Sequence, residues 1–201
     1  TSPRECKTIQ LVNGKNYMTQ MTVTKAHKTA WGSYTDRKNS YDDDADINAF
    51  IQLCKNDPDL HQYLSSYLPK ESLRFKRKTN GIYGVDLSIT TEDGKVCATI
   101  DIERWSQWNE DWPSYYRHIH FLGRKEKFLN QYNVPFFMAF MNYSRTKVLM
   151  ISEQDIRKYP TIDKYFKHKR VTDRVKELPM SEGYVYGKGI TDREKSLFAE
   201  R

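Results

Sequence analysis

Hydrophobic and polar residues alternate in two parts of this chain in the manner of β-strands. Residues 7–25 contain two strand-like runs around Asn13-Gly14, and residues 81–105 contain two more around Asp93-Gly94. Both dipeptides favour the tight turns of β-hairpins. The sequence therefore predicts two hairpins, the second having the stronger turn signal.

Other segments have helical spacing or continuous apolar runs. Apolar side chains recur at helical intervals in residues 45–56, from Leu60 to Tyr67, and in residues 114–131. Residues 136–143 and 147–151 are apolar runs that fit buried strands, and basic residues 72–79 fit either a strand or an exposed connector. Helix starts are expected at Ser152-x-x-Asp155 and Thr191-x-x-Glu194.

This order predicts an α/β or α+β domain with a mixed central sheet. The 201 residues fit a single domain, 1–201, with room for a substantial core. We expect the core at about residues 45–151, an N-terminal β-hairpin at about 7–25, and C-terminal helical additions within a basic, irregular extension at about 152–201.

Composition and charge narrow the class of protein. Hydrophobic residues make up 38% and aromatic residues 13% of the chain, which is typical of folded rather than disordered sequences. No apolar run approaches the length of a membrane span, and no signal-peptide pattern is found at the start. Cys6, Cys54 and Cys97 lack the spacing of a zinc site or a disulfide framework, so an intracellular setting, cytoplasmic or nucleoid-associated, is expected.

The net charge of +7 suits a polyanionic partner such as DNA, because cations that neutralise phosphates release counterions. Many basic proteins bind no nucleic acid, so charge alone does not decide the function.

Three acidic residues converge in the second predicted hairpin. If Asp93 and Gly94 are the two central residues of a type I′ turn, Glu92 lies opposite Lys95 and Asp86 lies opposite Asp101. Opposed side chains have Cβ atoms about 4.5–5.5 Å apart. Glu103, two residues beyond Asp101, shares its face.

The other face of this hairpin is apolar. It is expected to carry Val85, Leu87 and Ile89 on one strand and Ala98, Ile100 and Ile102 on the other.

Neighbouring carboxylates repel each other and raise one another's pKa unless a cation intervenes. Mg²⁺ or Mn²⁺ would relieve this repulsion, and such an ion can also activate water and neutralise phosphoryl charge. The alternative is that the acids are solvated residues on the open face of an antiparallel sheet.

These residues resemble the motif of the PD-(D/E)xK nuclease superfamily. Gly84-Val85-Asp86 is similar to its first element, with Val85 where Pro often stands, and Asp101-Ile102-Glu103 is similar to its second. The resemblance covers about residues 45–151. It implies a restriction-endonuclease-like αβββαβ core and Mg²⁺-dependent hydrolysis of phosphodiester bonds in DNA, with Mn²⁺ as a substitute ion.

The resemblance also implies roles for the acids. Asp86, Asp101 and Glu103 would be catalytic, with Asp86 and Asp101 as metal ligands. Glu103 occupies the usual Lys position, so it would orient water, act as a general base or add a ligand. Lys125 is a candidate replacement for the missing Lys.

Basic residues in the expected helix 114–131 are candidates for binding nucleic acid. Arg117, His120, Arg124 and Lys127 follow spacings that would form one stripe on a helix, suited to phosphate contacts. A solvated helix face has the same pattern.

Two further groups have both a structural and a functional interpretation. Trp105, Trp108 and Trp112 could stack on bases, but packing is the commoner role of such residues. The Asp42–Asp44 triplet could hold a cation, but carboxylates before a helix more often complement its dipole.

Phosphate-binding loops of the GxxxxGK[ST] type and GxSxG elbows are absent from the sequence. The leading expectation is an endodeoxyribonuclease, with a homodimer as the oligomer common among enzymes that cut both strands. The alternatives are a non-catalytic nucleic-acid-binding domain with a degenerate nuclease site, and an interaction protein without a nucleic-acid role.

Overall fold

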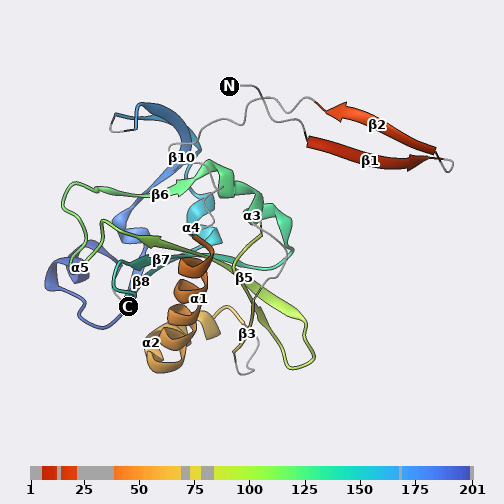
Figure 1. Cartoon of the computed structure of the whole chain (residues 1–201). Coiled ribbons are helices and arrows are strands. Elements are labelled where there is room, and N and C mark those ends of the chain that lie inside the picture. The colour runs from red at the N-terminus through yellow and green to blue at the C-terminus, as the bar shows by residue number, and fades with distance from the viewer. Residues whose placement is uncertain are drawn as a thin grey trace.

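A six-stranded mixed sheet forms the centre of the fold (Figure 1). The computed structural model describes residues 6–12, 15–21, 39–68, 73–77, 84–167 and 169–199, and side chains from residue 43 onward within these ranges. Strands β5 (Val96–Trp105) and β7 (Phe136–Asn142) are parallel, whereas every other neighbouring pair in this sheet is antiparallel. The predicted mixed α/β architecture is therefore confirmed. The strand order is β11 (Tyr184–Gly187), β8 (Lys147–Ser152), β7 (Phe136–Asn142), β5 (Val96–Trp105), β4 (Leu87–Thr90) and β3 (Arg74–Arg77).

The two apolar runs predicted as buried strands are β7 and β8, and both are buried along their whole length. Alternate residues of β7 enter different cores. Phe136, Met138 and Phe140 pack on one side of the sheet, while Phe137, Ala139 and Met141 pack on the other. Both faces of the central strands are thus covered, which explains why the run is continuously apolar.

Helices α1 (Asn39–Asn56) and α2 (Pro58–Ser65) cover one face of the sheet (Figure 1). Phe50 and Leu60 are fully buried against strand residues that include Ile100. Both helices were predicted, but α1 begins before the expected residue 45. The Asp42–Asp44 triplet therefore lies inside the helix, and Asp44 forms an ion pair with Arg77 at 2.7 Å.

The opposite face is covered by the segment between β5 and β7 and by parts of the C-terminal region. This layer contains the 3₁₀ helix η1 (Gly123–Lys125), α3 (Glu126–Gln131) and α4 (Glu153–Arg157). It also contains a second sheet, in the order β6 (His118–Leu122), β10 (Val171–Pro179) and β9 (Ile162–Phe166).

The predicted helix over residues 114–131 is wrong. Only α3 within it is α-helical, because His118–Leu122 instead pairs with β10 as strand β6. The helical pattern predicted one apolar face carrying Tyr115, Ile119 and Leu122. Ile119 and Leu122 are buried, but Tyr115 is 69% exposed. Their spacing fits a helix, and distant pairing with β10 overrides this local pattern.

The C-terminal region is less helical than predicted. Strands β9, β10 and β11 supply most of its regular structure, so the expectation of helical additions is wrong for these segments. The two predicted helix starts are confirmed. Ser152 caps α4, and Thr191 forms a capping box with Glu194 at the start of α5 (Asp192–Leu197).

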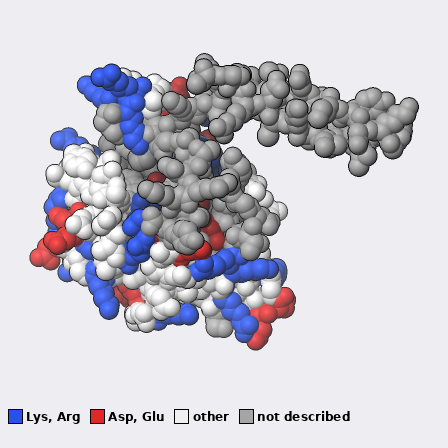
Figure 2. Space-filling view, viewed as in Figure 1, with Lys and Arg blue, Asp and Glu red and all other residues white. Residues whose placement is uncertain are grey.

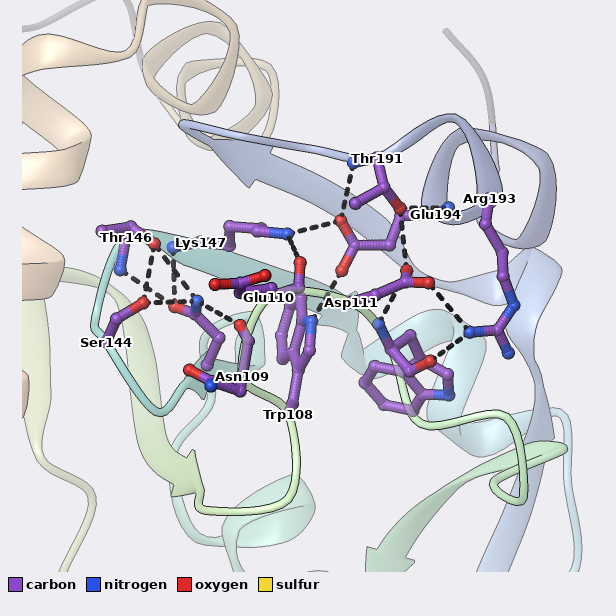
Figure 3. Close-up of polar contacts among 12 residues, drawn as sticks. Trp108, Asn109, Glu110, Asp111, Ser144, Thr146, Lys147, Thr191, Arg193 and Glu194 are labelled. Carbon is purple, nitrogen blue, oxygen red and sulfur yellow. Dashed lines mark hydrogen bonds and ion pairs between the residues drawn. The ribbon is translucent and has the colours of Figure 1, made fainter.

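A buried ion pair connects α5 to the main sheet (Figure 3). Lys147 at the start of β8 lies 2.7 Å from Glu194, and their side chains are 3% and 0% exposed. The Trp108 indole N–H donates to the other Glu194 oxygen at 2.7 Å. Trp105, Trp108 and Trp112 are all buried, which confirms the packing interpretation.

Strands β1 (Cys6–Val12) and β2 (Lys15–Met21) form the predicted N-terminal hairpin, with Val12 opposite Lys15. The expected turn residues Asn13 and Gly14 lie outside the described residues. Cys54 and Cys97 are free thiols. No helix in the described part of the chain is both long and apolar enough to span a membrane.

Candidate active site at the end of strand β4

The loop between β4 and β5 is one residue longer than predicted. Gly94 N–H donates to Thr91 O at 3.0 Å, Thr91 N–H donates to Lys95 O at 2.9 Å, and Gly94 has a φ of +85°. Three residues therefore connect Thr91 to Lys95, and the left-handed conformation that closes the loop favours glycine. Glu92 does not face Lys95; it forms an ion pair with Arg74 at 2.5 Å.

A β-bulge at Cys97 restores the predicted register. Thr90 pairs with Val96 and Ile89 with Ala98, which leaves Cys97 as an extra residue on β5. This extra residue offsets the longer loop. Leu87 consequently lies opposite Ile100, as the two-residue turn would have required.

The strand ladder ends at this pair, and Asp86 lies one residue before β4. Its carboxylate accepts a hydrogen bond from the Ile102 backbone N–H at 2.6 Å, which fixes Asp86 beside the strand that carries Asp101. Val85 and Leu87 pack in the two different hydrophobic cores, on opposite sides of the sheet. The expectation that these two residues share a face is wrong, because regular alternation stops where the ladder ends.

Lys125 joins the two acids of β5. Its Nζ lies 2.5 Å from Asp101 Oδ2 and 2.8 Å from Glu103 Oε2. The side chains of Lys125, Asp101 and Glu103 are 11%, 9% and 20% exposed, so these are not solvated acids on an open sheet face. The structure therefore contradicts the solvated alternative for Asp101 and Glu103.

A close contact holds the segment that presents Lys125. Lys125 ends η1, which begins at Gly123 directly after β6. A Cβ atom built on Gly123 would lie 2.7 Å from Arg174 Cβ and 2.8 Å from Arg174 O on β10. Glycine thus allows η1 to lie against β10.

Burial and mutual repulsion shape the ionisation of Asp86 and Asp101. Burial, followed by the negative charge of Asp101, raises the pKa of Asp86 to about 8. Burial also raises the pKa of Asp101, although Lys125 opposes this. Without a further cation, the two carboxyl groups favour retaining a proton.

Lys125 has the opposite effect on Glu103. Burial alone would raise the pKa of Glu103, but the charges of Lys125 and Arg124 outweigh burial and hold that pKa below its usual value. Burial likewise opposes the charge on Lys125, but Asp101 and Glu103 raise the pKa of its ammonium well above the ordinary range. At neutral pH, Glu103 is ionised and Lys125 is protonated.

The donor set of Asp86 and Asp101 fits a hard divalent cation. The partly buried carboxyl group of Asp86 lies near the buried one of Asp101, and Lys125 directly contacts only Asp101 of the two. No three His, Cys, Asp or Glu side chains in the described part of the chain are grouped closely enough to hold a metal ion by themselves. Mg²⁺ commonly uses one or two carboxylates and completes its shell with waters and substrate phosphates, so two suffice.

The raised pKa of Asp86 predicts a specific pH dependence of stability. Between the ordinary aspartate pKa of 3.8 and about 8, folded Asp86 keeps a proton that the unfolded chain has lost. Its stabilising contribution, measured in EDTA, is therefore lost as the pH rises through this window, at up to about 1.4 kcal/mol per pH unit. Chemical denaturation at several pH values measures how the free energy of unfolding changes with pH. We expect Asp86→Asn to lose the part of this pH slope that the retained proton causes.

Asp163→Asn is the matched control, because Asp163 is an exposed aspartate on β9. It should retain the wild-type pH slope. Equal slopes for wild type and Asp86→Asn would contradict the assignment of a retained proton to Asp86.

The four predicted nucleic-acid-binding residues do not form one helical stripe. Arg117 is exposed before β6, and Lys127 is exposed on α3 with its Nζ 5.0 Å from the Phe128 ring centroid. Arg124 lies in η1, where its charge acts on Asp101 and Glu103. The shared face was inferred from a helix that does not form there.

His120 lies in a buried environment on β6 and not on the basic helical stripe that the sequence predicts. It is 7% exposed on β6, and its Nε2 lies 3.1 Å from Glu177 Oε1. Burial and the nearby charge of Lys164 lower the pKa of His120 to about 4. His120 is therefore neutral at pH 7 in this fold.

Sequence reasoning identified Lys125 only as one candidate replacement and did not connect Asp43 with the acids. The charge of Asp43 on α1 makes the smallest of the described contributions that raise the pKa of Asp86. Neither relation follows from local spacing, because each depends on tertiary packing.

Comparisons with family models, curated proteins and solved structures give no match for this chain.

Proposed function

We propose that this chain is a metal-dependent endonuclease that hydrolyses phosphodiester bonds in DNA. The observation that carries the proposal is the contact of Lys125 with Asp101 and Glu103, next to the partly buried carboxyl group of Asp86. Two acids suited to a divalent cation and one amine that is protonated at neutral pH are a combination suited to a phosphodiester substrate.

The order of the elements supports the proposal. Helix α1, strands β3, β4 and β5, helix α3 and strand β7 follow the αβββαβ order of the PD-(D/E)xK superfamily that the sequence resembles. Helix α2, strand β6 and the 3₁₀ helix η1 are additional elements within that order. The proposed catalytic acids Asp86, Asp101 and Glu103 lie at the second and third of its strands.

In this proposal, Lys125 replaces the lysine that the motif lacks at Glu103. Its raised pKa keeps it protonated, so it donates hydrogen bonds and stabilises negative charge and does not act as a general base. It also holds Asp101 and Glu103 in fixed positions, with Arg124 adding positive charge nearby.

Asp86 and Asp101 would hold Mg²⁺ or Mn²⁺, which would supply an activated water and neutralise phosphoryl charge. Glu103 stays ionised and accepts hydrogen bonds, a role suited to orienting water. The Ile102 N–H bond keeps the Asp86 carboxylate directed at the site.

The net charge of +7 favours a polyanionic substrate, and DNA is the form that the family resemblance favours. We also propose an intracellular setting and a homodimer, the latter by analogy with enzymes that cut both strands.

A plasmid-cleavage assay tests this function. The full chain is expected to nick or linearise supercoiled DNA with Mg²⁺ or Mn²⁺ and to leave it intact in EDTA. Absence of cleavage of DNA and RNA under every metal condition would contradict the proposal.

A non-catalytic nucleic-acid-binding domain is the second candidate. The observation that favours it is that Lys125 neutralises both Asp101 and Glu103, because an amine in such a contact can be purely structural. Duplex binding without cleavage is the outcome that identifies this candidate.

A further inference from the structure

Positive charge is concentrated at the tip of the β9–β10 hairpin. The residues between the strands are Lys167, His168, Lys169 and Arg170. Lys167, Lys169 and Arg170 are exposed. Figure 2 shows Lys and Arg side chains gathered at this end of the molecule, where β10 rises in Figure 1.

In the turn between β9 and β10, Arg170 occupies a position whose backbone conformation favours glycine. Lys169 N–H donates to Phe166 O at 3.1 Å, and Arg170 N–H donates to Lys167 O at 3.3 Å. Arg170 has a φ of +52°, in the left-handed region that non-glycine residues adopt at an energetic cost. A strained residue that presents an exposed cation indicates a role for the side chain beyond turn formation.

The hairpin is directly connected to the candidate active site. Strand β10 leads from the tip to Arg174, whose backbone lies against Gly123 of η1. The same 3₁₀ helix carries Arg124 and ends in Lys125, which contacts Asp101 and Glu103. The tip cations and the acids are therefore held by one continuous, packed set of elements.

The spacing along this connection suits a DNA groove. Arg170 lies directly before β10, and a strand rises about 3.3 Å per residue, so Val171 and Arg174 are separated by roughly 10 Å along β10. The major groove of B-DNA is about 12 Å wide and admits a two-stranded β-ribbon. The Arg174 side chain, which is 66% exposed and lies 3.9 Å from Glu126, places a further arginine between the tip and the site.

We propose that the β9–β10 hairpin is a DNA-binding arm whose tip residues Lys167, Lys169 and Arg170 contact backbone phosphates of a duplex. The placement of the duplex over the acids rests on the proposed nuclease function, but the binding role of the arm can be measured separately. Phosphate contacts position a protein on DNA without reading its sequence, so the arm contributes affinity and orientation.

Duplex binding by the full chain in EDTA, followed by fluorescence anisotropy at several salt concentrations, tests the arm. The arm variant is Lys167→Gln/Lys169→Gln/Arg170→Gly. Each lost phosphate contact lowers the magnitude of the slope of log affinity against log salt by about 0.9. We expect the slope to fall by about 2–3 and affinity to fall at least about tenfold, irrespective of DNA sequence.

The matched control removes the same number of charges elsewhere. Lys55→Gln/Lys188→Gln/Lys195→Gln changes exposed residues at the end of α1, after β11 and on α5. It should retain most of the wild-type slope. Arg170→Gly alone should weaken binding while its thermal midpoint stays equal to or above that of wild type, because glycine relieves the left-handed strain.

Cleavage by the same proteins separates this inference from the proposed function. Cleavage by wild type together with unchanged binding by the arm variant overturns the arm and leaves the nuclease proposal standing. Weakened binding by the arm variant, without cleavage by wild type, supports the arm and contradicts the nuclease. An equal loss in the control triple, or no salt-dependent duplex binding by wild type, also overturns the arm.

Discussion

Lys125→Met is expected to lower the rate of plasmid cleavage by a factor of about 100 to 1000. Lys125 Nζ lies 2.5 Å from Asp101 and 2.8 Å from Glu103, and its positive charge favours the ionised form of both carboxylates. Methionine has a similar length but cannot donate a hydrogen bond or stabilise negative charge. The measurement is a single-turnover rate with saturating Mg²⁺, at a temperature where circular dichroism shows the variant folded.

Lys188→Met is the matched control, because it removes the same functional group from an exposed position directly after β11. Its cleavage rate should stay within about threefold of wild type, equivalent to less than about 0.7 kcal/mol. A folded Lys125→Met protein that cleaves at the wild-type rate would contradict the catalytic role of Lys125.

Lys147→Met is expected to lower the free energy of unfolding by about 3–5 kcal/mol, because it leaves the Glu194 carboxylate buried without its cation. The two groups are 2.7 Å apart, and their side chains are 3% and 0% exposed. Urea denaturation followed by tryptophan fluorescence measures the change.

A double variant distinguishes loss of the ion pair from loss of packing. In Lys147→Met/Glu194→Gln no buried charge remains, and the single amide oxygen of glutamine can still accept from one of the two N–H groups, of Trp108 and Thr191, that now bond separate oxygens of Glu194. We expect it to recover a large part of the lost stability. Lys195→Met, at an exposed position on α5, should be nearly neutral. A Lys147→Met variant within about 1 kcal/mol of wild type would show that the pair behaves like a surface salt bridge.

The parts of the fold that the sequence predicts well are those governed by local patterns. Strand β7 is a continuous apolar run because both its faces are covered, and Ser152 and Thr191 start helices through their own side chains. Strand β6 could not be predicted in the same way. Its strand conformation depends on pairing such as His120 with Glu177, which are far apart in the sequence.

At the candidate site, two departures from the predicted hairpin geometry offset each other. The turn at Asp93-Gly94 has one more residue than predicted, and the bulge at Cys97 adds one residue to the opposite strand. The register is consequently as predicted up to Leu87 and Ile100, where the ladder ends one residue before Asp86. Lys125 reaches these acids through the packing of η1 against β10, a contact that no local spacing encodes.

The most direct test of the proposed metal-dependent nuclease compares Mg²⁺-dependent plasmid cleavage by wild type, Asp101→Asn and Glu92→Gln. Glu92 is an exposed acid in the β4–β5 loop and serves as the control. We predict metal-dependent cleavage by wild type and Glu92→Gln, and a loss of about a thousandfold in Asp101→Asn, equivalent to roughly 4 kcal/mol. Wild-type activity in folded Asp101→Asn, or no cleavage by wild type with any divalent cation, would contradict the account.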